Sequence, residues 1–203
     1  MTDDALSAEL SARLAETPIP LKEVAALLDG ATHEQRVRWV RSVGRAGQRA
    51  LWQAAAGFLP LSLQDLVPAA RRDGETVRHL GKNTLPAFTH FEKRFCRPAG
   101  EDPRAPRALH GFNFQSLSWL TGPGYYVAHA DPALPEVLID YREIPLAAPP
   151  GWPALRRNET GPARLVYGFM VDRLRRVSEH VTIGSAARNG KDLGSWFLLT
   201  REG

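Results

Sequence analysis

The fold is decided by residues 180–201, which read HVTIGSAARNGKDLGSWFLLTR. The pair Asn189-Gly190 is the strongest short signal for a two-residue β-hairpin turn, so we expect strands at 180–188 and 191–201. Both faces of this hairpin carry apolar groups, with Ile183 and Leu198 on one face and Phe197 on the other. Strands covered on both faces lie in the centre of a sheet or in a sheet that curves or closes on itself.

Working back along the chain, the spacing of turn residues predicts three more strands, at 110–121, 125–130 and 136–141, and a shorter strand at 76–80. A five-residue loop after Ala130 would place His129 opposite Val137 and Val127 opposite Ile139. One face then collects the predicted core residues Phe112, Phe114, Leu120, Tyr125, Val127, Val137, Ile139 and Tyr141. The other face collects Asn113, Gln115, Thr121, Glu136 and Asp140.

The first 60 residues have the pattern of helices. Leucines recur every four residues from Leu6, a second helix follows Pro20, and the capping-box residues Thr32 and Gln35 begin a long helix that runs to about Ala56. A turn of helix is expected at 62–66, and a further helix where Phe88, Phe91 and Phe95 recur. Residues 164–178 can form a helix or a strand, and the gathering of apolar residues on one side favours a helix.

The fold class is therefore α+β, with N-terminal helices followed by a curved, mainly antiparallel β-sheet that can close into a barrel under one covering helix. We divide the chain into a helical region, 1–60, and an α+β domain, 61–203, which can form one compact unit.

Composition sets limits on the class of protein. The chain has 203 residues, 43% of them hydrophobic and 24% charged, which is typical of globular domains. Its single cysteine, Cys96, excludes an internal disulfide and any multi-cysteine metal site, so we expect a cytoplasmic protein. No signal peptide and no membrane span are expected. The six histidines show no metal-ligand spacing, so no metal and no cofactor is predicted.

The net charge of +4 is unevenly distributed. Residues 1–31 hold six acidic and two basic side chains, whereas the predicted helix 32–56 holds five arginines and one glutamate. Four of these arginines, which we call the arginine stripe, lie on one face of that helix: Arg38, Arg41, Arg45 and Arg49. The stripe can pair with the acidic N-terminal segment, or it can bind nucleic acid or an acidic partner.

Three classes of function stay open. The first is binding of a small, partly apolar ligand in a cavity of the curved sheet, with candidate contacts at Trp119, Tyr126, His129, Asp140 and His180. The second is a binding module that uses the arginine stripe. The third is an acid/base enzyme that uses Asp140 with His129 or His180. Cys96, between Arg94 and Arg97, is a further candidate nucleophile, with a packing role as its alternative.

Overall fold

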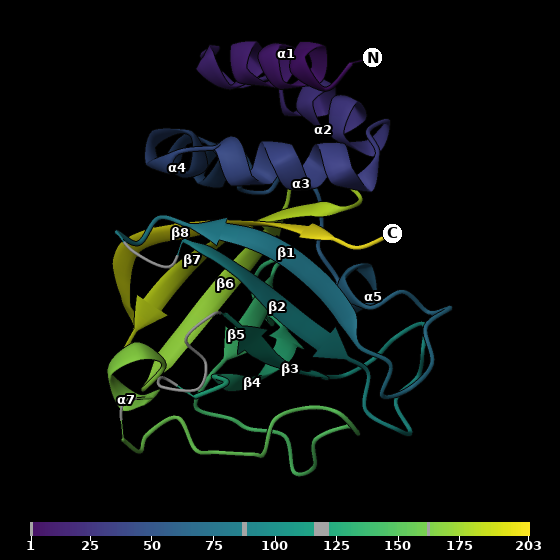
Figure 1. Ribbon diagram of the computed structural model, residues 1–203, viewed down its shortest axis with the longest axis vertical. Helices are drawn as coiled ribbons and strands as arrows, with labels where there is room; N and C mark the ends of the chain where they lie inside the picture. The colour runs from purple at the N-terminus through teal and green to yellow at the C-terminus, as the bar shows by residue number, and fades with distance from the viewer. Residues whose placement is uncertain (1, 87–88, 116–121, 162) are drawn as a thin grey trace.

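The computed structural model describes residues 2–86, 89–115, 122–161 and 163–203. Its strands form a closed antiparallel barrel in which each strand pairs with the next and the last pairs with the first (Figure 1). They are β1 (Val77–Asn83), β2 (His90–Cys96), β3 (Leu109–Phe114), β4 (Tyr125–Ala130), β5 (Val137–Asp140), β6 (Met170–Arg176), β7 (Val181–Arg188) and β8 (Lys191–Arg201). The predicted antiparallel sheet is thus confirmed in its closed form.

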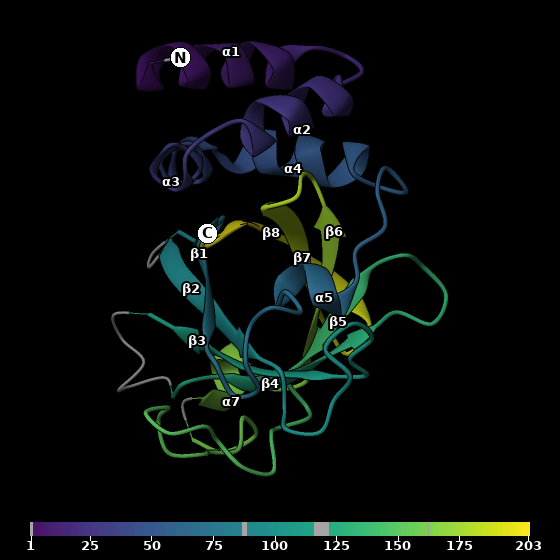
Figure 2. The same ribbon diagram turned by 90° about the vertical axis from the view of Figure 1, so that its right-hand side faces the viewer.

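Helices cover one side of this barrel. They are α1 (Asp3–Ala15), α2 (Leu21–Asp29), α3 (His33–Ser42) and α4 (Arg45–Ala54). In Figures 1 and 2 these helices lie together above β8, and α3 and α4 contact the sheet directly. Trp39 and Leu51 of the helices share a hydrophobic cluster with Ile183 and Leu198, which are outward residues of β7 and β8. The double-sided apolar pattern of the last hairpin is explained by this packing, because one face meets the helices and the other lines the barrel.

The two ends of the barrel differ. Two short helices mark them, α5 (Leu63–Leu66) at one end and α7 (Ala163–Val166) near the other, on opposite sides of Figure 1. Leu63, Leu66 and Val67 are buried in the cluster that fills the barrel interior at the α5 end. We call this the closed end, seen in Figure 2, and we call the end beside α7 the mouth.

Several local predictions are confirmed. The Thr32 hydroxyl accepts from the backbone N–H of Gln35, whose side chain accepts from the backbone N–H of Thr32. Asn189 and Gly190 both have positive φ, at 50° and 75°, as a tight hairpin turn between β7 and β8 requires. The turn of helix at 62–66 and the strand beginning near Thr76 are also present.

The single long helix predicted over 32–56 is wrong. The backbone is extended at Val43 and Gly44, so the segment forms two helices, α3 and α4. The side chain of Gln48 donates to the Val43 carbonyl, which the break leaves without a helical partner. Two short helices can follow the curved outer face of the barrel better than one straight helix.

Two further predicted helices are strands. Phe91 and Phe95 belong to β2, and most of 164–178 forms α7 followed by β6. The covering helix is therefore reduced to α7. Residues four apart, such as Phe91 and Phe95 or Met170 and Leu174, share a face in a helix and also in a strand, because four is a multiple of the strand period. Phe88 lies outside the described residues.

The predicted register between β4 and β5 is shifted by one residue. His129 pairs with Leu138 and Val127 with Asp140, because the connecting loop is one residue longer than expected. A one-residue shift exchanges the two faces of a strand. Phe112 and Tyr125 are buried on the outside of the barrel against Trp152, while Asn113 points inward. Leu120 and Thr121, which were predicted to lie on opposite faces, are outside the described residues.

Among the described helices, we find none with the length and apolar character needed to cross a bilayer.

Candidate functional site

The mouth of the barrel leads into an interior pocket of about 410 Å³. Its apolar and aromatic lining residues include Leu85, Phe91, Val166, Tyr167, Met170, Leu193 and Phe197. Its polar lining residues include Asn83, Lys93, Asn113, Gln115, Tyr141, Asp172, Arg188 and Ser195. A mostly apolar concave site with a few convergent polar groups is the usual form of a small-molecule site.

Small residues on the inner face leave room for this pocket. Ala186 of β7 lies beside Asp172 of β6, and Gly184 lies beside Phe197 of β8. A Cβ atom on Gly184 would come within 2.2 Å of the Phe197 ring. The ring therefore fills the space that a side chain at Gly184 would need, and the pocket lies on the mouth side of this contact.

Four buried polar side chains meet inside the pocket, and we call them the tetrad: Lys93, Asn113, Tyr141 and Asp172. Lys93 Nζ donates to Asp172 Oδ2 at 2.9 Å, to Asn113 Oδ1 at 3.2 Å and to the Tyr141 hydroxyl. The Tyr141 hydroxyl in turn donates to Asp172 Oδ2 at 3.1 Å and accepts from Asn113 Nδ2 at 2.9 Å. Three acceptors around Nζ require three N–H groups, so this geometry describes an ammonium.

The surroundings of Lys93 are strongly desolvated. Its side chain is 1% exposed, and its Nζ lies 4.9 Å from the ring centres of both Tyr141 and Phe197 and 5.1 Å from that of Tyr126. Burial lowers the pKa of the Lys93 ammonium, and the charge and hydrogen bond of Asp172 oppose that change. The faces of the aromatic rings also attract the cation. The pocket thus holds a neutral ion pair in an apolar wall.

Tyr141 stays a neutral phenol in this setting. Burial, followed by the negative charge of Asp172, raises the pKa of its hydroxyl well above the ordinary value. Its ring stacks on Tyr167 with centroids 5.5 Å apart, and the Tyr167 hydroxyl accepts from Gln115. These contacts fix the orientation of the phenol toward Asp172.

Strand alternation positions the tetrad. Lys93 and Asn113 face each other across β2 and β3, and Asp172 lies on the inner face of β6. Tyr141 follows β5 directly, with its backbone N–H bonded to Met170 of β6. Four different strands or strand ends therefore bring these groups to one point.

Of the five residues predicted to bind a ligand, Tyr126 lies inside the barrel, where its hydroxyl donates to the Arg94 carbonyl. His129 pairs with Glu143 at 3.1 Å, and Asp140 forms an ion pair with Arg142 at 2.6 Å. His180 lies at the closed end. Neither Tyr126 nor these last three residues line the barrel pocket. His129 and Asp140 lie near each other on the neighbouring strands β4 and β5, outside the pocket. Trp119 lies outside the described residues.

The arginine stripe is divided by the break at Val43. Arg38 forms an ion pair with Asp3 of α1 at 2.7 Å, which is the internal pairing expected from the charge distribution. Arg45 donates to the Gly194 carbonyl and lies over the Trp196 ring. Arg41 and Arg49 are exposed on α3 and α4.

Cys96 is buried in the barrel wall. Burial raises the pKa of its thiol to about 12, with a further contribution from the charge of Asp73. A reactive cysteine needs a lowered pKa, so the structure favours the packing role. Within the described ranges, we find no cluster of three or more side chains with the character of metal ligands.

Sequence reasoning missed Lys93 and Asp172 as site residues. Both lie in segments whose pattern predicts helices, and in the helix predicted over 164–178 Asp172 falls on the polar side. The signal that would have found them is a charged residue with apolar neighbours two positions away on either side, as in Phe91-x-Lys93-x-Phe95 and Met170-x-Asp172-x-Leu174. In a strand, this pattern places the charge among inward apolar residues.

Fold and site together define an eight-stranded antiparallel β-barrel with a polar cluster in its interior pocket. Comparison of the chain with family models, with curated proteins and with solved structures gives no match.

Proposed function

We propose that the protein binds a small, partly apolar molecule inside the barrel, with a polar group of that molecule directed at the tetrad. The observation that carries this proposal is the pocket of about 410 Å³ that combines apolar walls with a buried, hydrogen-bonded ion pair. A core built for stability alone would gain little from such a pair, because desolvation of two charges offsets most of their attraction.

The rim of the pocket also supports ligand entry. Leu85 and Leu193 line the pocket and are 49% and 47% exposed. An apolar molecule can therefore contact hydrophobic surface before it enters the barrel. Because Cys96 is a free thiol, we propose that the protein resides in a reducing compartment such as the cytosol.

A fluorescence titration with the neutral apolar probe N-phenyl-1-naphthylamine tests the proposal. We expect saturable binding to the wild-type chain and a loss of affinity of about tenfold or more in Ala186→Phe, whose new ring would occupy the pocket beside Asp172.

Ala187→Phe is the matched control, because Ala187 is the next residue of β7 and its side chain points out of the barrel. Circular dichroism would verify that both variants fold. Equal binding by the two variants, or no saturable binding by the wild type, would contradict binding inside the barrel. Native mass spectrometry of protein purified from its own host would show whether a molecule is retained.

A further inference from the structure

Most of the hydrogen-bonding capacity of the tetrad is already used within it. Lys93 Nζ has three N–H groups and three acceptors. The Tyr141 hydroxyl donates one hydrogen bond and accepts two. A hydroxyl has one donor and two acceptor positions, so Tyr141 is saturated as well. Neither the ammonium nor the phenol has capacity left for a ligand.

One oxygen of the tetrad is different. Asp172 Oδ2 accepts from both Lys93 and Tyr141, whereas Asp172 Oδ1 has no hydrogen-bond partner among the described residues. The Asp172 side chain is 4% exposed, lies on the inner face of β6 and lines the pocket. A buried carboxylate oxygen without a donor is unfavourable, so its position at a pocket indicates a donor that the occupant supplies.

We propose that the pocket selects a neutral ligand carrying a hydroxyl or N–H group, which donates a hydrogen bond to Asp172 Oδ1. This inference rests on the proposed function and names its ligand class. A buried lysine alone would suggest a carboxylate ligand. Here Asp172 already neutralises Lys93, so a second carboxylate would meet Oδ1 with repulsion and would find no open ammonium hydrogen.

Asn113 favours a hydroxyl in particular. Its Nδ2 atom donates one hydrogen to Tyr141 and carries a second hydrogen in the same amide plane. A hydroxyl can donate to Asp172 and accept at the same time, so it matches both groups. An ether or a ketone can only accept.

Three probes of one shape test this selectivity by calorimetry: naphthalen-2-ylmethanol, its methyl ether and 2-naphthoate. A hydrogen bond to a charged acceptor predicts that the alcohol binds about tenfold to a hundredfold more tightly than the ether. We expect the carboxylate to bind more weakly than the ether.

Substitution of the acceptor gives a second readout. In Asp172→Asn, and in the charge-neutral double variant Lys93→Met/Asp172→Asn, the preference for alcohol over ether should fall to about one. The double variant removes both charges together, so it remains folded if the single variant does not. Asp131→Asn is the matched control, because Asp131 is also ion-paired, its side chain is 5% exposed, and it pairs with Arg173 on the outside of the barrel.

The outcomes separate the two proposals. Equal binding of alcohol and ether, tighter binding of 2-naphthoate, or an unchanged preference in the double variant overturns the donor selectivity but leaves pocket binding standing. Failure of all three probes and of N-phenyl-1-naphthylamine to bind overturns both.

Discussion

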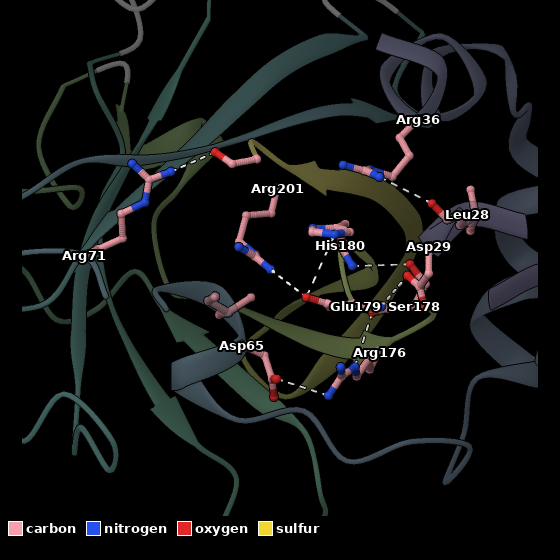
Figure 3. A network of polar contacts seen from close by, with 12 residues as sticks. Leu28, Asp29, Arg36, Asp65, Arg71, Arg176, Ser178, Glu179, His180 and Arg201 are labelled. Carbon is pink, nitrogen blue, oxygen red and sulfur yellow. Dashed lines mark hydrogen bonds and ion pairs between the residues drawn. The ribbon is translucent and has the colours of Figure 1, made fainter. Parts of the chain in front are cut away.

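The mouth and the closed end of the barrel both contain buried charges, but they are built in different ways. At the mouth, Lys93 and Asp172 lie 2.9 Å apart, and the tetrad surrounds them with hydrogen bonds. At the closed end, Figure 3 shows Arg201 and His180 both directed at Glu179, with contacts of 4.0 Å and 3.9 Å. Glu179 is 60% exposed, so solvent screens this second cluster.

The closed-end cluster connects the helices to the barrel. The Glu179 backbone N–H donates to Asp29 at the end of α2, and Arg176 pairs with Asp65 of α5. Arg36 of α3 donates to the Leu28 carbonyl, also drawn in Figure 3. The charged side chains at the closed end therefore join the helices and the barrel strands through many weak contacts. At the mouth, one tightly bonded pair faces an open space.

Removal of one charged partner from each cluster should give the largest difference in stability between the mouth and the closed end. Asp172→Ala leaves the Lys93 ammonium buried without its counter-charge, so we expect the free energy of unfolding to fall by about 3–5 kcal/mol. Glu179→Ala should lower it by less than about 1 kcal/mol, because its contacts are long and exposed. Urea unfolding measures both, and equal losses would mean that the two clusters are equivalent.

Low pH should destabilise the barrel interior next to α5. The Nε2–H of His79 donates to the Leu66 carbonyl, and burial lowers the pKa of His79 to about 3, with Arg201 and Lys93 adding to the shift. The unfolded chain, with a pKa near 6.5, binds the proton first. The stability contributed by neutral His79 is therefore complete above about pH 6.5 and is lost at about 1.4 kcal/mol per pH unit as pH falls toward 3.

Unfolding at several pH values measures this slope. In His79→Gln, whose amide can still donate to Leu66, the slope should decrease between pH 6.5 and 4. An unchanged slope would assign the acid sensitivity to other groups, such as His180, whose pKa is also lowered by burial and by Arg36 and Arg201.

The pocket side also depends on close packing. Gly184→Ala would place a methyl group against the Phe197 ring, so we expect a loss of about 1–3 kcal/mol, together with weaker binding of N-phenyl-1-naphthylamine as the ring moves into the pocket. Gly44→Ala is the comparison, since no atom of the described residues lies within 4 Å of a Cβ there and its φ is −81°. Its loss should be a few tenths of a kcal/mol. Thermal unfolding distinguishes them.

The smallest change in stability is expected for substitutions in the helices that cover the barrel. Arg41→Gln/Arg49→Gln alters the exposed members of the arginine stripe, so stability should change by less than about 0.5 kcal/mol. Because Arg38 and Arg45 already have partners, we expect no saturable binding of a 20-base-pair DNA duplex at low salt. Binding by the wild type that the double variant loses would instead establish the stripe as an anion-binding surface.

The fold was predictable where local chemistry decides it. The Asn189-Gly190 turn, the Thr32 capping box and the two apolar faces of the last hairpin are properties of short segments, and all appear in the structure. Helix and strand cannot be distinguished where apolar residues lie four apart, since both periods fit that spacing. The pairings on both edges of β6 decide between them, and these involve distant residues.

The site itself could not be predicted from the sequence. Lys93 and Asp172 lie 79 positions apart, and only the closed barrel brings them to one point. The loop before Val137 is one residue longer than expected, which changes the register between β4 and β5. The expected register places Asn113 on the face opposite the apolar core, although Asn113 belongs to the tetrad. Register depends on loop length, which composition does not determine.

The pairing of β8 with β1 has a consequence for how the chain folds. His79 lies opposite Arg201, 122 positions further along the chain. During synthesis α1–α4 can form from local contacts as soon as they emerge, whereas the barrel must wait for β8. Contacts at such sequence separation carry a large loop-closure entropy and slow the folding rate. The pocket should therefore be the last part of the molecule to form, in the step in which β8 pairs with β1.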